Sequence, residues 1–408
     1  MRIRRDYTRQ KFRSRRQRPG CFSQVLLIGA LVGVAIVFWQ WLGIGQPFDV
    51  MPPDDRLASA TVAFARGDLD SAIVQSRQRL NAQPDDVGAL KLLTRALIYR
   101  SYSDYDTARD RDTALAFTTA AYARRPNHPE VAALHAFALQ AVSRPGAAAD
   151  VARTVLEAQP DHALARTSLA LAYGVARSYE VALRESLRAL EALGTPTTAD
   201  DALDVLRALA ISYSDTGDYN AAVQTVERAL TLNDRLAALY FERALYAMQL
   251  GDVDAATVAY YEILAQQPEN VKVRLRLCEL SSLLRERETA LRYCDEVTTR
   301  APAWFEGWYH LGREYFLQGV FLEAQTAFQR CTALQHTQQI AISERRIECW
   351  LLQGQAAEIR GDCSRLVAIY NEFRVMAATG AIDQTWEYPP EGPPNCASGA
   401  DPQGGAGG

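Results

Sequence analysis

The chain has 408 residues, of which 48% are apolar and 23% are charged, so most of it should fold, yet it is too long for one ordinary globular core unless it is built from repeats. The formal net charge of −4 hides an asymmetry, because residues 1–20 carry nine Arg or Lys and one Asp, a balance of +8 that leaves −12 for the remainder. An acidic body argues against nucleic-acid binding, which needs basic stripes along one face, and we expect no nucleic-acid partner.

An uncharged apolar stretch follows the basic tail. Residues 21–45 contain no charged side chain and are long enough to cross a bilayer, which takes about 20 apolar residues. Trp39 and Trp41 lie at the far end of the stretch, where amphipathic rings favour the headgroup level. Because positively charged flanks stay in the cytoplasm, we predict a single-pass membrane protein with cytoplasmic residues 1–20 and an extracytoplasmic body that begins with a linker, residues 46–55.

A cleaved signal peptide is the alternative interpretation of this stretch. Gly43 and Gly45 are small residues at a spacing that suits a cleavage site. The apolar region of a signal peptide is typically shorter, about 7–15 residues, and we therefore favour an uncleaved transmembrane helix over residues 21–45.

Helical periodicity extends from about Leu57 to about Met376, and two landmarks recur within it. A small residue early in each second helix recurs at Ala72, Ala114, Ala148, Ala182, Ala222, Ala256, Ala290 and Ala324. The residue that closes each second helix follows at Pro84, Pro126, Pro160, Gly194, Asp234, Pro268, Pro302 and His336. Most steps are 34 residues, but one is eight residues longer, around residues 101–112, and another is six longer, at 195–200.

The eighth unit shows the pattern most fully. It reads Trp308-x2-Leu311-Gly312-x2-Tyr315, followed by Ala324, Phe328 and Cys331. This order and spacing resemble the tetratricopeptide repeat, a helix–turn–helix unit of 34 residues. The resemblance covers roughly residues 53–378. It implies an all-α fold, an α-solenoid of about nine repeats over residues 56–379 that winds as a right-handed superhelix.

The same resemblance implies a function. In the family, the first helices line a concave groove that holds peptide or protein partners, without catalysis. Positions two, five, nine and twelve of each first helix give the groove candidates Phe137, Arg207, Phe241, Leu245, Met248, Lys272, Tyr309, Arg313 and Phe316. Each of these side chains can instead pack against a neighbouring first helix, and both interpretations stay open at this point.

The ninth unit departs from the pattern. Trp350 and Gly354 keep the register, but Leu366 replaces the small alanine. We expect residues 337–346 to lengthen the first helix of this unit, since terminal repeats are often atypical. Residues 380–408 are rich in proline and glycine and are expected to form a disordered tail.

The longer of the two insertions carries aromatic and acidic side chains, namely Tyr102, Asp104, Tyr105, Asp106, Asp110 and Asp112. It suits a recognition loop, a weak cation site made from carboxylates, or a lengthened turn with capping aspartates. We favour the lengthened turn, because the spacing fits no calcium-binding loop.

Six cysteines follow the predicted membrane span. An even number outside the cytoplasm permits disulfides, and the pairs Cys278–Cys294, Cys331–Cys349 and Cys363–Cys396 suit the repeat geometry. The alternative, which the sequence modestly favours, is small, buried, free thiols where the repeat needs small side chains.

Motifs for catalysis or cofactors are missing from the sequence. It has no Gly-rich phosphate loop and no nucleophile elbow, and its histidines and cysteines lack metal-ligand spacing, so we expect no enzyme activity, no cofactor and no metal site. Two hypotheses remain: a membrane-anchored scaffold that binds protein or peptide partners in its groove, or a structural subunit of a larger membrane or envelope complex.

Overall fold

The computed structural model describes residues 53–193, 199–388, 393 and 396. The predicted basic tail, the predicted span at 21–45 and most of the predicted linker lie outside the described residues. No helix in the described ranges has both the length and the apolar character needed to cross a membrane. Contacts divide the chain into Met1–Asp55 and Arg56–Gly408, so nearly all of the described residues belong to the second unit.

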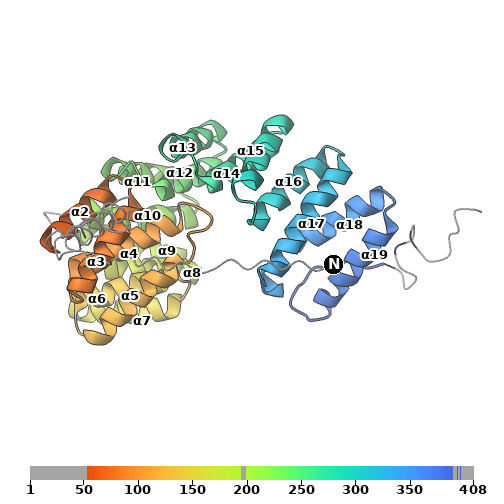
Figure 1. Cartoon of the computed structure of the whole chain (residues 1–408). Helices are drawn as coiled ribbons and strands as arrows, with labels where there is room; N and C mark the ends of the chain where they lie inside the picture. The colour runs from red at the N-terminus through yellow and green to blue at the C-terminus, as the bar shows by residue number, and fades with distance from the viewer. Residues whose placement is uncertain (1–52, 194–198, 389–392, 394–395, 397–408) are drawn as a thin grey trace, which may run out of the picture. The chain divides into compact units, whose positions relative to one another are not determined.

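Within the described residues the secondary structure is helical, without strands, and the α-helices form nine consecutive pairs (Figure 1). The first helices of the pairs are α2 (Pro53–Ala65), α4 (Val87–Ser101), α6 (Pro129–Ala141), α8 (Ala163–Val175), α10 (Ala199–Asp215), α12 (Ala237–Gln249), α14 (Val271–Leu283), α16 (Phe305–Leu317) and α18 (Glu348–Ile359). The second helices are α3 (Leu69–Ala82), α5 (Asp110–Arg124), α7 (Pro145–Ala158), α9 (Tyr179–Glu191), α11 (Tyr219–Leu232), α13 (Val253–Gln266), α15 (Arg287–Arg300), α17 (Phe321–Thr337) and α19 (Cys363–Ala377). This is an α-solenoid, as the repeat period predicts.

The turn inside several pairs follows from a Gly-Asp dipeptide. Gly217 has φ of +84°, in the left-handed region that ends a helix at little cost for glycine. The next residue, Asp218, accepts a hydrogen bond from the N–H of Ala221 (3.0 Å) and so caps α11. Asp68 and Asp252 cap α3 and α13 in the same way.

Small residues set the distance between the two helices of a pair. All eight alanines of the repeated small position are 0% exposed. In the eighth pair, a Cβ added to Gly312 would lie 2.8 Å from the ring of Phe328, so only glycine lets α16 approach α17 this closely. The core is therefore a series of layers between successive helices, which is typical of a solenoid.

The region between the last two pairs differs from the prediction. Residues 337–346 do not lengthen the first helix of the ninth unit: α17 ends at Thr337, Gln339 has φ of +54°, and a short 3-10 helix, η1 (Ile342–Glu344), precedes α18. Left-handed backbone at Gln339 cannot continue a helix, which explains the break. Beyond α19, the chain returns over the last pair, where Trp386 packs against Tyr370 and Phe373.

Candidate functional site

The first helices of several neighbouring pairs pack side by side. These contacts join α4 to α6, α6 to α8, α8 to α10, α14 to α16, and α16 to α18. Helix α4 also reaches α10, although more than 100 residues separate the residues that meet there. A groove for a partner must therefore be sought on the faces of the first helices that the chain itself leaves uncovered.

Buried ion pairs join the first helix of the second pair to that of the fifth. Arg95 of α4 is 2% exposed and donates to Asp204 (2.5 Å) and Asp201 (2.6 Å) of α10. The hydroxyl of Tyr99 donates to Asp204 as well (3.2 Å). Burial alone would lower the pKa of Arg95, but the two carboxylates raise it above its ordinary value. This part of the groove is filled by the chain's own side chains.

The turn inside the first pair contacts a distant part of the chain. The side-chain amide of Asn233, just after α11, donates to the carbonyl of Phe64 at the end of α2 (3.2 Å). A Cβ on Gly67 would lie 2.5 Å from the Cβ of Arg235, so this contact also needs a glycine. The turn of the first pair therefore docks on the connection between the fifth and sixth pairs.

Four of the nine groove candidates are largely covered within the chain. Phe137 is a core residue, only 4% exposed. Arg207 pairs with Glu242 (2.6 Å) and lies over the ring of Tyr102 (4.5 Å). The ammonium of Lys272 lies over the ring of Phe241 (4.6 Å), and burial lowers the pKa of Lys272 to about 8.

Among the other five candidates, one is clearly exposed. Leu245 of α12 is 51% exposed, whereas Met248, Tyr309, Arg313 and Phe316 are half-buried. They lie on two first helices, Leu245 and Met248 on α12 and the other three on α16.

Three further exposed apolar residues lie on these or neighbouring first helices and were missed by the sequence reasoning. They are the last residues of α14, α16 and α18: Leu283 (66% exposed), Leu317 (47%) and Ile359 (56%). Leu317 follows Arg313 by four residues and therefore lies on the same face of α16. The 34-residue step from Leu283 to Leu317 was a signal that could have revealed them. We name the set formed by Leu245, Met248, Leu283, Phe316, Leu317 and Ile359 the apolar strip.

Charged groups beside the apolar strip are mostly paired. Glu279 interacts with Arg276 (2.6 Å) and with His310 (3.1 Å), whose pKa burial lowers to about 4. Arg346 pairs with Glu306 (2.9 Å) and covers the ring of Tyr309. Arg313, by contrast, forms no ion pair and no side-chain hydrogen bond with any described residue. The surface thus offers aliphatic contacts beside an uncompensated guanidinium, which suits a segment with apolar anchors and a carboxylate.

The cysteines are paired in the structure instead of lying as free thiols. Disulfides join Cys278 to Cys294, Cys331 to Cys349 and Cys363 to Cys396. The first lies within the seventh pair, the second joins the eighth to the ninth, and the third ties the returning tail to the start of α19. No group of three or more His, Cys, Asp or Glu in the described part of the chain is placed to hold a metal ion, and this includes the carboxylates of the 101–112 insertion.

Comparison with known proteins supports the repeat architecture. A family model described as tetratricopeptide repeat matches residues 205–235. No curated protein matches the chain. Among solved structures, the chain is similar to the APC/C hetero-tetramer Cut9-Hcn1, with a TM-score of 0.52 and 14% identity, covering 78% of this chain and 63% of that one. This likeness concerns the fold alone, and the chain spans less than two thirds of that relative.

Two other solved structures are less similar. They are the human IFIT1 dimer with PPP-AAAA (TM-score 0.47, 13% identity, 77% of this chain and 80% of that one) and YrrB, a TPR protein with an unusual peptide-binding site (TM-score 0.34, 19% identity, 45% and 92%).

Proposed function

We propose that this protein is a scaffold that binds protein or peptide partners through the inner face of its sixth to ninth helix pairs and has no catalysis of its own. The observation that carries the proposal is the apolar strip beside the unpaired Arg313. Exposed aliphatic side chains that repeat along one face of successive helices are typical of a docking surface. A segment with aliphatic anchors and an acidic side chain is the partner that this surface fits.

We further propose that the scaffold is anchored in a membrane by residues 21–45, with the repeats outside the cytoplasm. The support is the uncharged stretch and the basic residues 1–20 before it. Three disulfides in the repeats fit an oxidising compartment.

Thiol labelling of intact cells tests this topology. Cells are treated with a membrane-impermeant reductant and then a membrane-impermeant maleimide, and labelling of Cys396 is compared with that of Cys21. We expect label on Cys396 and none on Cys21. Label on Cys396 only after lysis would refute the extracytoplasmic location.

A structural subunit of a larger membrane or envelope complex is the second candidate function. Apolar side chains on the second helices favour it, because Val258 and Tyr261 of α13 are each about half exposed (50% and 49%). A complex that held the protein by these helices would leave the apolar strip free.

Site-specific photocrosslinking distinguishes the two functions. A photoreactive amino acid at Leu317 (47% exposed) probes the apolar strip, and the same group at Val258 (50% exposed) is the matched control on a second helix. We expect a discrete covalent adduct from position 317 that is lost when Arg313→Glu is added, and none from 258. Adducts from 258 alone would support the structural subunit. Adducts from neither position would contradict both.

A further inference from the structure

The 101–112 insertion contains a segment that contacts the later repeats as a bound peptide would. The side-chain amide of Asn270 donates to the carbonyl of Ser103 (2.8 Å), and the ammonium of Lys272 donates to the carbonyl of Tyr102. The carboxylate of Asp104 accepts hydrogen bonds from the backbone N–H of Lys272 (3.0 Å) and of Val271 (3.3 Å). We name residues 102–105 the strap. Two carbonyls and one carboxylate of the strap thus accept hydrogen bonds from groups at the start of α14.

The strap also fills an apolar site. The ring of Tyr105 stacks on the ring of Trp304, with centroids 4.7 Å apart and an interplanar angle of 23°. Both rings pack on a separate buried cluster in the seventh pair, made of Val271, Leu275, Val297 and Ala301. Apolar walls with a few placed hydrogen-bonding groups are the usual composition of a ligand site.

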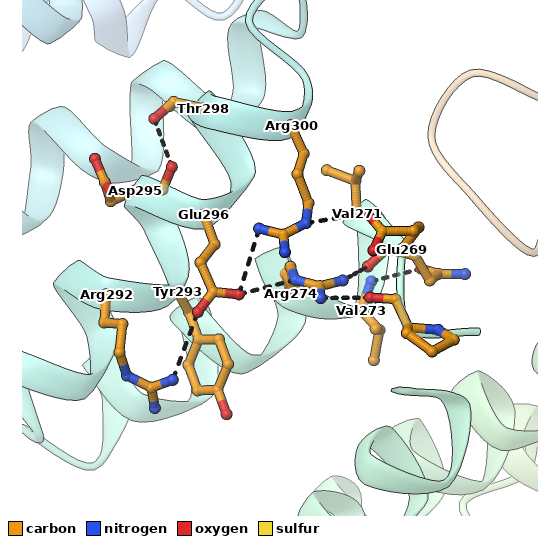
Figure 2. A network of polar contacts seen from close by, with 12 residues as sticks. Glu269, Val271, Val273, Arg274, Arg292, Tyr293, Asp295, Glu296, Thr298 and Arg300 are labelled. Carbon is orange, nitrogen blue, oxygen red and sulfur yellow. Dashed lines mark hydrogen bonds and ion pairs between the residues drawn. The ribbon is translucent and has the colours of Figure 1, made fainter. Parts of the chain in front are cut away.

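Contacts that do not involve the strap hold the receiving surface in place. Arg274 is 7% exposed and donates to the carbonyls of Pro268 and Asn270. It also donates to Glu296 of α15 (2.9 Å), as Figure 2 shows near its centre. Asn270 in turn caps α14 by accepting from the N–H of Val273 (3.0 Å). Arg274 and Asn270 hold the turn before α14 through contacts that do not include the strap. The surface that receives the strap should therefore keep its geometry when the strap dissociates.

Docking of the strap buries two ionisable groups. Burial raises the pKa of Asp104, against the hydrogen bonds from backbone N–H groups, and lowers the pKa of Lys272 to about 8. The insertion exceeds the 34-residue period, and the third and fourth pairs form without such an insertion. The strap is therefore an addition to the repeat, and it docks despite a desolvation cost.

We propose that Asn270, Lys272, Trp304 and the first N–H groups of α14 form a peptide-recognition site, occupied in cis by the strap. The partner it fits is a segment that carries an aspartate directly followed by an aromatic residue. The site uses residues other than the apolar strip, so this inference goes beyond the proposed scaffold function and has its own test. A tethered segment competes at an effective concentration of roughly millimolar, so a partner binds only when the strap is released.

The test uses the full chain in mild detergent and a fluorescein-labelled peptide with the sequence of residues 100–112. Binding is measured by fluorescence anisotropy for the wild type and for D104N/Y105A, whose strap lacks the carboxylate charge and the stacking ring. We expect the double variant to bind the peptide at least tenfold more tightly than the wild type. A control peptide with the same two replacements should bind at least tenfold more weakly than the parent peptide, and adding Trp304→Ala to the double variant should abolish binding.

Far-UV circular dichroism checks that each variant is folded. If the double variant does not fold, the single variant Tyr105→Ala replaces it, since it weakens the docking of the strap less. This variant should bind the peptide severalfold more tightly than the wild type. If the folded released variant binds the parent and control peptides equally, or binds neither, the strap is a structural clamp only and the proposal is wrong. Binding through the apolar strip would persist in the Trp304→Ala variant, which separates the two surfaces.

Discussion

Replacing Asp204 with alanine tests whether buried ion pairs hold the second helix pair against the fifth. The carboxylate is 0% exposed, receives the guanidinium of Arg95 at 2.5 Å and accepts the hydroxyl of Tyr99 at 3.2 Å. Removing one partner of a buried ion pair typically costs about 3–5 kcal/mol, because the other charge stays buried without compensation. Arg95 keeps Asp201 at 2.6 Å, so we expect the lower end, a loss of about 3 kcal/mol in the free energy of unfolding.

Urea unfolding followed by far-UV circular dichroism measures this loss. The matched control is Asp150→Ala, which removes the exposed pair Arg153–Asp150 (2.7 Å, 52% and 75% exposed) and should cost about 0.5 kcal/mol or less. A double-mutant cycle with Arg95→Met gives the coupling between the two charges. If Asp204→Ala costs no more than the control, or if the coupling is near zero, the ion pair does not hold these helices together and the reasoning is refuted.

Two further predictions concern pH and packing. Glu130 has its pKa lowered to about 2, first by the hydrogen bond from His162 and also by Lys91 against the effect of burial. The ionised carboxylate should therefore stabilise the fold fully above about pH 4.5, and this stabilisation should disappear as the pH falls toward 2. In an acid titration of the free energy of unfolding, Glu130→Gln should lose less stability over this range than the wild type. Equal losses in the two proteins would contradict the lowered pKa of Glu130. Gly312→Ala places a methyl group 2.8 Å from the ring of Phe328 and should cost about 1–3 kcal/mol, measured by thermal or urea unfolding. The control Gly146→Ala, with nothing within 4 Å, should be neutral or stabilise by about 0.5 kcal/mol; equal effects at the two sites would refute the packing argument.

The sequence predicted which helix faces carry the candidate site. It did not predict which residues on those faces stay uncovered by the rest of the chain. The family positions located Leu245, Arg313 and Phe316, which retain exposed or half-buried surface. The same positions also selected Arg207 and Lys272, whose side chains contact the chain's own residues. A repeat pattern describes each unit against its neighbours, and it contains no information about which units meet after a turn of the superhelix.

By itself, the sequence determined the local architecture. The 34-residue period and the eight alanines, which are all 0% exposed, specify helix pairs, because these features act within one unit or between adjacent units. Only the tertiary structure decided what the insertion does. Asp104 reaches Lys272, and Arg95 reaches Asp204, because small rotations between successive pairs accumulate until residues more than 100 positions apart lie side by side. Such contacts depend on the sum of many small angles, which no single repeat encodes.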